Sequence, residues 1–345
     1  MLNIRMNLVN DFEEYILGEI KKTQLGGFSF EEYDDWEKEE ILRKNQQIIE
    51  LQKTGTDTTQ IKESLKPDKL KNEYRRHLVY TYGNLLERII PVKPRKILYT
   101  SDFQRLPEYE EGLCFLEEKI RSGANLLPHM SRQIFDSMSK DGLLYDFNIQ
   151  HLHLGTKPDA KHPEMIEGRK KVLYCVVDDE TVYFLVIEDH NHWGDIDLIR
   201  LIKNNFPYLL KPFEMNVHSL SSHLSEEDRV KLRKAGINTP IEVDGKCYMS
   251  PGWGVNTMGT SINAVFEMDC YYRHYRSVEE NFRQFMNENE EEILNVLSSK
   301  NEFNLVMVNI SPVILIDKGN GIIINLELNG DQIHRIGIAQ EEITD

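Results

Sequence analysis

Residues 171–190 read KVLYCVVDDETVYFLVIEDH, and this stretch decides the central part of the fold. Two runs rich in valine, tyrosine and isoleucine, residues 172–177 and 182–188, flank the turn-forming segment Asp178-Asp179-Glu180. Such runs on either side of a polar turn predict a β-hairpin. Residues 147–154 indicate a further strand, followed by a polar loop that holds two prolines and ends at Arg169. We therefore expect an antiparallel sheet in the middle of the chain.

Segments with the apolar spacing of helices precede and follow this predicted sheet in the sequence. Residues 7–88 are expected to be helical, with interruptions at the glycine- and threonine-containing stretch 53–59 and at Lys66-Pro67. The other predicted helices are residues 108–122, a segment that begins near residue 131, and residues 195–205, 226–235 and 262–297. The other predicted strands are residues 96–99, 313–316 and 322–328, the last two joined by a glycine-rich turn.

A chain of 345 residues exceeds the usual size of one domain, so more than one core is expected. The predicted class is α+β, with a helical N-terminal region, a central antiparallel sheet, and a C-terminal helix plus β-hairpin. The expected regions are residues 1–90 (helical), 91–210 (α+β core) and 211–345 (C-terminal α+β region). The apolar stripes of the first region suit docking of a partner protein or oligomerisation.

The acidic composition limits the classes of partner. The chain carries 57 aspartates and glutamates against 41 lysines and arginines, a formal net charge of -16. This balance argues against broad, non-specific adhesion to nucleic acid or anionic membranes, although a local basic groove is compatible with it.

The spacing of the cysteines and the lack of long apolar runs indicate the cellular compartment. The four cysteines lie far apart and form no Cys-x-x-Cys pair, so neither a disulfide framework nor a thiolate zinc site is indicated. No run of about 18 apolar residues predicts a membrane span, and the first residues do not resemble a signal peptide. We expect a cytoplasmic protein with no membrane partner.

Two His-x-His pairs bracket the predicted hairpin and form the most site-like pattern in the sequence. His151 and His153 lie two apart in a predicted strand and therefore project from the same face of it. His190 and His192 follow the last strand of the hairpin with the same spacing. All four imidazoles are able to converge if the strand that carries the first pair is a neighbour of the hairpin.

Three interpretations of this pattern stay open. In the first, histidines act as general acid and base without a metal, and Lys157, Arg169 and Lys170 neutralise a phosphorane-like transition state. In the second, imidazoles bind a divalent metal, Asp146 or Asp189 adds a carboxylate, and Trp193 forms a wall of the site. In the third, some histidines are ordinary strand residues that form hydrogen bonds at a sheet edge.

The glycine-rich stretch 251–261 precedes a predicted helix, where backbone amides can receive an anion. It lacks the spacing and the lysine of a phosphate-binding P-loop. We interpret it as a structural loop that ends in a Thr260 or Ser261 helix cap.

The order of a histidine-bearing strand IQHLHLG (149–155), a loop ending at Arg169, and the hairpin resembles the catalytic core of the RelE and HigB superfamily of ribonuclease toxins. In that superfamily helices precede an antiparallel sheet whose late strand leads to a catalytic histidine or tyrosine. The resemblance covers residues 141–193 and implies that Arg169 stabilises phosphate and that His190 is the late acid–base residue. This chain departs from the superfamily in its greater length, its acidity and its HLHLG histidines.

The segments DGLLYDFNIQHLHLG (141–155) and IEDHNHW (187–193) also resemble a group of uncharacterised bacterial proteins linked to mobile elements and phage defence. Together, the resemblances imply a nuclease, foremost a metal-independent ribonuclease effector or toxin that acts on RNA without a cofactor. Its expected catalytic residues are His151, His153, Arg169 and His190, and its expected substrate-binding residues are Lys157, Lys170 and Trp193.

Two alternatives from other functional classes accompany this expectation. One is a non-catalytic sensor or scaffold subunit of an anti-phage defence complex. The other is a metal-dependent hydrolase with a divalent metal on His151, His153, His190 and His192.

Overall fold

The computed structural model describes residues 2–23, 25–28, 33–190, 196–217, 219–221, 224–257, 259–296 and 302–340. The chain forms two compact units: unit 1 comprises residues 1–24, 28–82 and 267–345, and unit 2 comprises residues 25–27 and 83–266. The predicted mixture of helices with antiparallel sheets is confirmed. By this division residues 211–266 belong to unit 2 and residues 267–345 to unit 1, and helix α10 (Ile262–Glu288) has residues in both.

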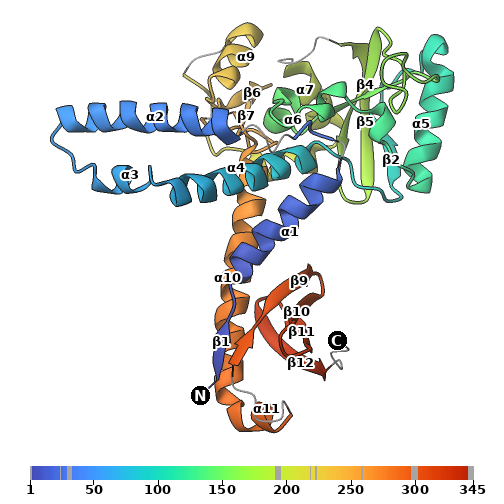
Figure 1. Ribbon diagram of the computed structural model, residues 1–345. Helices are drawn as coiled ribbons and strands as arrows, with labels where there is room; N and C mark the ends of the chain where they lie inside the picture. Colours follow the sequence, from blue (N-terminus) through green and yellow to red (C-terminus); the bar gives the residue numbers. More distant parts are fainter. Residues whose placement is uncertain are drawn as a thin grey trace. The chain divides into compact units, whose positions relative to one another are not determined.

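Unit 1 combines helices with a C-terminal antiparallel sheet in the strand order β12-β11-β10-β9 (Figure 1). The predicted hairpin is confirmed as β10 and β11, whereas β9 and β12 were not predicted. Its helices are α1 (Leu8–Lys22), α2 (Tyr33–Lys53), α3 (Thr59–Glu63), α4 (Pro67–Glu87), α10 and α11 (Glu290–Val296). Its strands are β1 (Asn3–Arg5), β8 (Glu302–Asn304), β9 (Val306–Ile310), β10 (Val313–Asp317), β11 (Ile322–Asn329) and β12 (Gln332–Gln340).

The core of unit 1 forms where α1 packs along α10 and against the sheet. Phe12 of α1 is stacked with Tyr271 and Tyr275 of α10, at ring-centroid distances of 5.5 and 5.1 Å. Leu315 and Ile324, which lie opposite one another on β10 and β11, belong to the same buried cluster. Tyr272 and Tyr275 of α10 therefore contribute to a hydrophobic core.

Unit 2 is built on a four-stranded sheet in the order β2-β5-β4-β3, in which β2 is parallel to β5 and the other pairs are antiparallel. Its strands are β2 (Lys96–Tyr99), β3 (Gln150–His153), β4 (Lys171–Val177), β5 (Thr181–Asp189), β6 (Ile241–Val243) and β7 (Lys246–Tyr248). Its α-helices are α5 (Glu110–Ser122), α6 (Gly142–Phe147), α7 (Ile196–Asn205), α8 (Pro207–Leu210) and α9 (Glu226–Lys234). Single-turn 3-10 helices span Pro107–Tyr109, Leu127–His129, Arg132–Phe135 and Lys211–Phe213.

The predicted central hairpin is confirmed as β4 and β5. The side chain of Asp178 accepts hydrogen bonds from the backbone amides of Glu180 and Thr181, at 2.8 and 2.6 Å, and so fixes the turn. In the sheet, Val172 of β4 pairs with His153 of β3 on one side and with Glu188 of β5 on the other. This register brings the two predicted histidine-bearing segments to the same end of the sheet.

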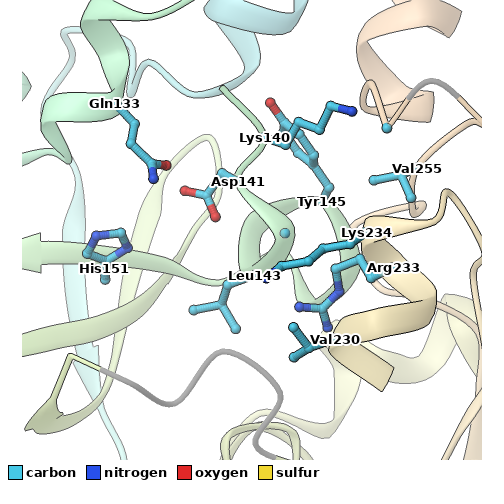
Figure 2. Close-up of a pocket in the computed structure, with 12 residues that line it drawn as sticks. Gln133, Lys140, Asp141, Leu143, Tyr145, His151, Val230, Arg233, Lys234 and Val255 are labelled. Carbon is cyan, nitrogen blue, oxygen red and sulfur yellow. The ribbon is translucent and has the colours of Figure 1, made fainter. Parts of the chain in front are cut away.

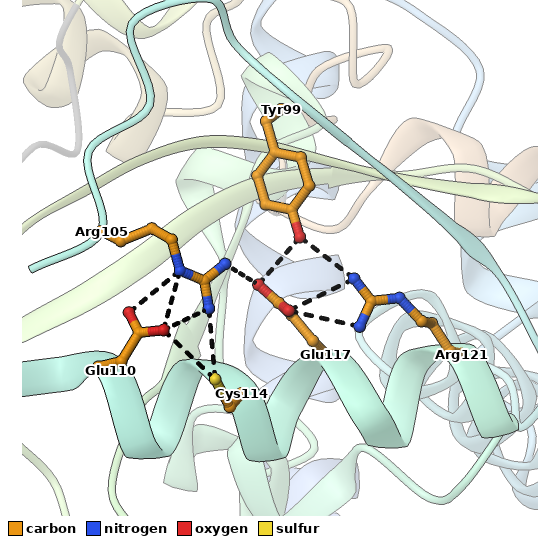
Figure 3. Close-up of polar contacts among 6 residues, drawn as sticks. All are labelled: Tyr99, Arg105, Glu110, Cys114, Glu117 and Arg121. Atoms are coloured by element: carbon orange, nitrogen blue, oxygen red, sulfur yellow. Dashed lines mark hydrogen bonds and ion pairs between the residues drawn. The ribbon is translucent and has the colours of Figure 1, made fainter.

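Helix α5 is held against the edge strand β2 by a network of charged side chains (Figure 3). Glu117 of α5 accepts hydrogen bonds from the Tyr99 hydroxyl at 2.9 Å and from Arg105 at 2.6 Å. Arg105 also binds both carboxylate oxygens of Glu110. The Glu110 carboxylate raises the pKa of the Cys114 thiol, so this cysteine is not an activated nucleophile.

Two local expectations differ from the structure. The helix expected near residue 131 is only the short 3-10 helix Arg132–Phe135. The strand expected from residue 147 begins at Gln150, because Asp141 caps α6 and Asn148 ends this helix in the left-handed conformation, with φ of 56°. The interpretation of Ser261 as a helix cap is confirmed, because its side chain accepts a hydrogen bond from the Ala264 amide at 3.3 Å. Among the described residues, no helix has both the length and the apolar character needed to cross a membrane.

Candidate metal centre

The structure brings together three of the predicted site histidines, His151, His153 and His190. The first two project from one face of β3 because successive side chains of a strand alternate. His190 follows the last residue of β5 and is two positions beyond Glu188, the cross-strand partner of Val172. Since Val172 also pairs with His153, the sheet register places all three imidazoles over one face.

The three rings form a compact cluster. One ligand nitrogen from each ring lies within 4.8 Å of those of the other two. The ring centroids are 4.8 Å apart for His151 and His190, 5.4 Å for His153 and His190, and 5.8 Å for His151 and His153. The planes of the rings are inclined to one another by 78° for His151 and His190, 35° for His153 and His190, and 68° for His151 and His153.

Burial keeps two of the imidazoles neutral. His151 and His153 are only 5% and 8% exposed. Loss of solvation by burial, reinforced by the neighbouring imidazoles, lowers the pKa of each to about 3. At neutral pH both rings are therefore in the form that binds metal ions and that accepts, but does not supply, an acidic proton.

A buried imidazole outside the cluster fixes the end of β3. Nδ1 of His129 lies 2.9 Å from the carbonyl oxygen of His153 and donates a hydrogen bond to it. Burial lowers the pKa of His129 to about 4. Among the described residues, Nδ1 of His153 has no hydrogen-bond partner although it is buried. A buried nitrogen in this condition costs about 1–3 kcal/mol unless a ligand satisfies it.

The predicted basic residues of the site have other contacts or face solvent. The guanidinium of Arg169 donates a hydrogen bond to the carbonyl oxygen of Glu108 at 2.8 Å and lies over the Tyr109 ring. Lys170 forms an ion pair with Asp189 at 2.9 Å, and its side chain is 78% exposed. Lys157 is also exposed.

Each of the two candidate carboxylates, Asp146 and Asp189, forms an ion pair with a basic side chain. Asp146 forms a buried ion pair with Arg233, whose Nε lies 3.0 Å from Oδ2, and its Oδ1 accepts a hydrogen bond from Ser250 at 2.6 Å. Oδ2 of Asp189 is the oxygen that pairs with Lys170. The expectation that one of them completes a metal site is therefore corrected for Asp146, which is a structural partner of Arg233.

Two predicted residues, His192 and Trp193, lie outside the described residues. The sequence did not predict a role for His129, because this histidine follows a proline and has no partner histidine two residues away. It also did not predict the pocket that includes His151 in its wall. Helices α6 and α9 form much of this pocket, and only the tertiary structure brings these helices together.

Comparison with protein-family models, with curated proteins and with solved structures found no match to the chain.

Proposed function

We propose that the chain is a metal-dependent hydrolase in which His151, His153 and His190 hold a divalent transition-metal ion such as zinc. The observation that carries this proposal is the convergence of three ligand nitrogens, within 4.8 Å of one another, at the end of a rigid sheet. Three imidazoles are the ligand set of an open, catalytic zinc site, which keeps a further position for water.

The distances support binding after a small adjustment of the side chains. A tetrahedral zinc ion, about 2.0–2.1 Å from each nitrogen, holds its ligand atoms about 3.3 Å apart. Rotation of the rings about their side-chain bonds would be needed to bring the nitrogens from within 4.8 Å to this separation. Coordination would also satisfy the buried nitrogen of His153.

The chemistry expected of such a centre is activation of water. Held by the three imidazoles, a zinc ion would supply this activation by lowering the pKa of a bound water from 15.7 to about 7. The residues of this chain would contribute the orientation, because His151 and His153 are buried and held by the β3–β4 register.

Zinc content tests the proposal directly. The full chain is stripped with a chelator, reloaded with zinc, and analysed for bound metal beside a His153→Ala variant. We expect about one zinc ion per intact chain and at least a tenfold weaker affinity in the variant. His162→Ala is the matched control, because His162 lies in a loop of the same unit with a side chain 42% exposed.

Hydrolysis is measured on the same samples with p-nitrophenyl acetate, a neutral ester that reports on metal-bound hydroxide. We expect zinc-dependent turnover in the intact chain and in His162→Ala, and its loss in His153→Ala. Absence of bound zinc in the intact chain, or equal zinc affinity in all three proteins, would show that the proposal is wrong.

A second candidate is the metal-independent ribonuclease on a RelE-like sheet that the sequence implies. It is supported by the antiparallel β3-β4-β5 arrangement and by the position of His190 directly after the late strand. Two features support it less: the Arg169 guanidinium contacts Glu108 and Tyr109, and buried imidazoles with pKa values near 3 are poor proton donors at neutral pH. RNA cleavage that persists in chelator and is lost in His190→Ala would favour this candidate over the hydrolase.

A further inference from the structure

A pocket of about 490 Å³ in unit 2 includes His151 in its wall. Its volume falls in the range of about 300–1,000 Å³ that is usual for sites enclosing small molecules. Figure 2 shows His151 on one side of the pocket, Arg233 and Val255 on the other, and Asp141 between them. A molecule in this space would therefore have one end beside the imidazole cluster.

The charges of the pocket favour an anion. Three cationic side chains, Lys140, Arg233 and Lys234, line it together with one carboxylate, that of Asp141. Arg233 is neutralised by Asp146, and Asp141 accepts a hydrogen bond from the Leu144 amide at 3.0 Å. The side chains of Lys140 and Lys234 both lack a hydrogen bond or ion pair to any residue that the structure describes.

Such lysines are notable in a chain with a net charge of -16, where acidic side chains are in excess. Two ammonium groups in one pocket, neither of them paired with a carboxylate in the described part of the chain, create a local positive potential against the acidic background. An anionic ligand group would gain charge-assisted hydrogen bonds from them without displacing an existing ion pair.

The backbone leaves room for Lys140. Gly259, which also lines the pocket, has a φ of +76°, and a Cβ at this position would lie 2.5 Å from Nζ of Lys140. A side chain there would therefore displace the ammonium group. The remaining wall includes Leu143, Val230 and Val255, which offer contact to an apolar part of a ligand.

We propose that this pocket binds the substrate of the metal centre through an anionic group, a phosphoryl or a carboxylate, held by Lys140 and Lys234. The bond to be hydrolysed would then lie on the His151 side of the pocket, with an apolar part of the substrate against Leu143, Val230 and Val255. This inference rests on the proposed metal-dependent hydrolase, because it assigns the substrate class of that site.

Binding to the metal-free full chain tests the pocket separately from the chemistry. Titration calorimetry is performed with phenyl phosphate, benzoate and neutral phenol as probes. The variant is Lys140→Gln/Lys234→Gln, and the matched control is Lys231→Gln, a lysine of the same helix α9 with a side chain 70% exposed. We expect the double variant to raise the Kd for the anionic probe at least about tenfold, and the control to leave it unchanged.

The probes distinguish the two sources of negative charge. Tighter binding of phenyl phosphate than of benzoate assigns the site to phosphoryl compounds, and the reverse order assigns it to carboxylates. Phenol binding as tightly as the anions, an unchanged Kd in the double variant, or no binding of either anion at about 10 mM would overturn the inference. None of these outcomes depends on zinc, whereas failure of the proposed hydrolase appears as a missing metal, so the two failures are distinguishable.

Discussion

The buried ion pair between Arg233 and Asp146 joins α9 to α6 beside the pocket, and its removal should strongly destabilise unit 2. The two side chains are only 8% and 6% exposed, and Nε lies 3.0 Å from Oδ2. At an effective dielectric constant of about 20, this separation corresponds to an attraction of about 5 kcal/mol. Arg233→Met leaves the Asp146 carboxylate buried without its cation, so we expect a loss of about 3–5 kcal/mol in the free energy of unfolding.

The double variant Arg233→Met/Asp146→Asn should recover part of this loss, because it leaves no uncompensated charge. Urea unfolding followed by pulsed hydrogen exchange and mass spectrometry, read on peptides from α6 and α9, keeps unit 2 separate from unit 1. Arg200→Met is a matched control: Arg200 also has its Nε 3.0 Å from a carboxylate, that of Asp244, but its side chain is 42% exposed.

The control should cost less than about 1 kcal/mol, since exposed ion pairs are screened by water. A loss below about 1 kcal/mol for Arg233→Met, or strictly additive costs in the double-variant cycle, would refute the reasoning that burial makes this pair strong.

Two further predictions concern the histidine cluster and helix α5. Burial holds the pKa values of His151 and His153 near 3, against 6.5 for an ordinary histidine, so as the pH falls from 6.5 towards 3 the unfolded chain binds protons that the folded chain does not. The free energy of unfolding of the metal-free protein should therefore reach its full value above pH 6.5 and be lower at pH 5 by at most about 2 kcal/mol for each of the two histidines. A urea midpoint that does not change between pH 6.5 and pH 5 would contradict this prediction. Gly112→Ala would place a Cβ 2.0 Å from the Leu154 carbonyl oxygen. The cost of this overpacking, about 1–3 kcal/mol, should exceed the gain in helix propensity of about 1 kcal/mol, so we expect the variant to be less stable. Thermal unfolding that shows a more stable variant would count against this reasoning.

Short-range patterns in the sequence predicted many of the helices and strands. The hairpin was predictable because the apolar, β-favouring runs 172–177 and 182–188 and the turn residues at 178–180 act over short distances. Likewise, the predicted strand at residues 96–99 is present, and the helix predicted over residues 195–205 is present as α7 (Ile196–Asn205). The strand expected at residue 147 was shortened because a capping aspartate three residues before Leu144 starts a helix there, a competition that periodicity alone does not resolve.

For the candidate site, the spacing of His151 and His153 predicted a shared face, since alternation along a strand is a local property. Their meeting with His190 required β3 to pair with β4 in one particular register, and a shift of one residue would have turned the pair to the other face. Nothing local distinguishes Arg169, which resembles a phosphate-binding residue in the sequence and contacts the Tyr109 ring in the structure.

The sequence by itself determined the central hairpin, the helices with strong apolar stripes and the paired orientation of two histidines, because these depend on backbone preferences and side-chain alternation within a few residues. Only the tertiary structure decided that His190 joins that pair, that Asp146 belongs to Arg233, and that Lys140 and Lys234 line one pocket with His151. These contacts join residues far apart in the chain, and their energy depends on burial and on sheet register, which arise only when the whole unit packs.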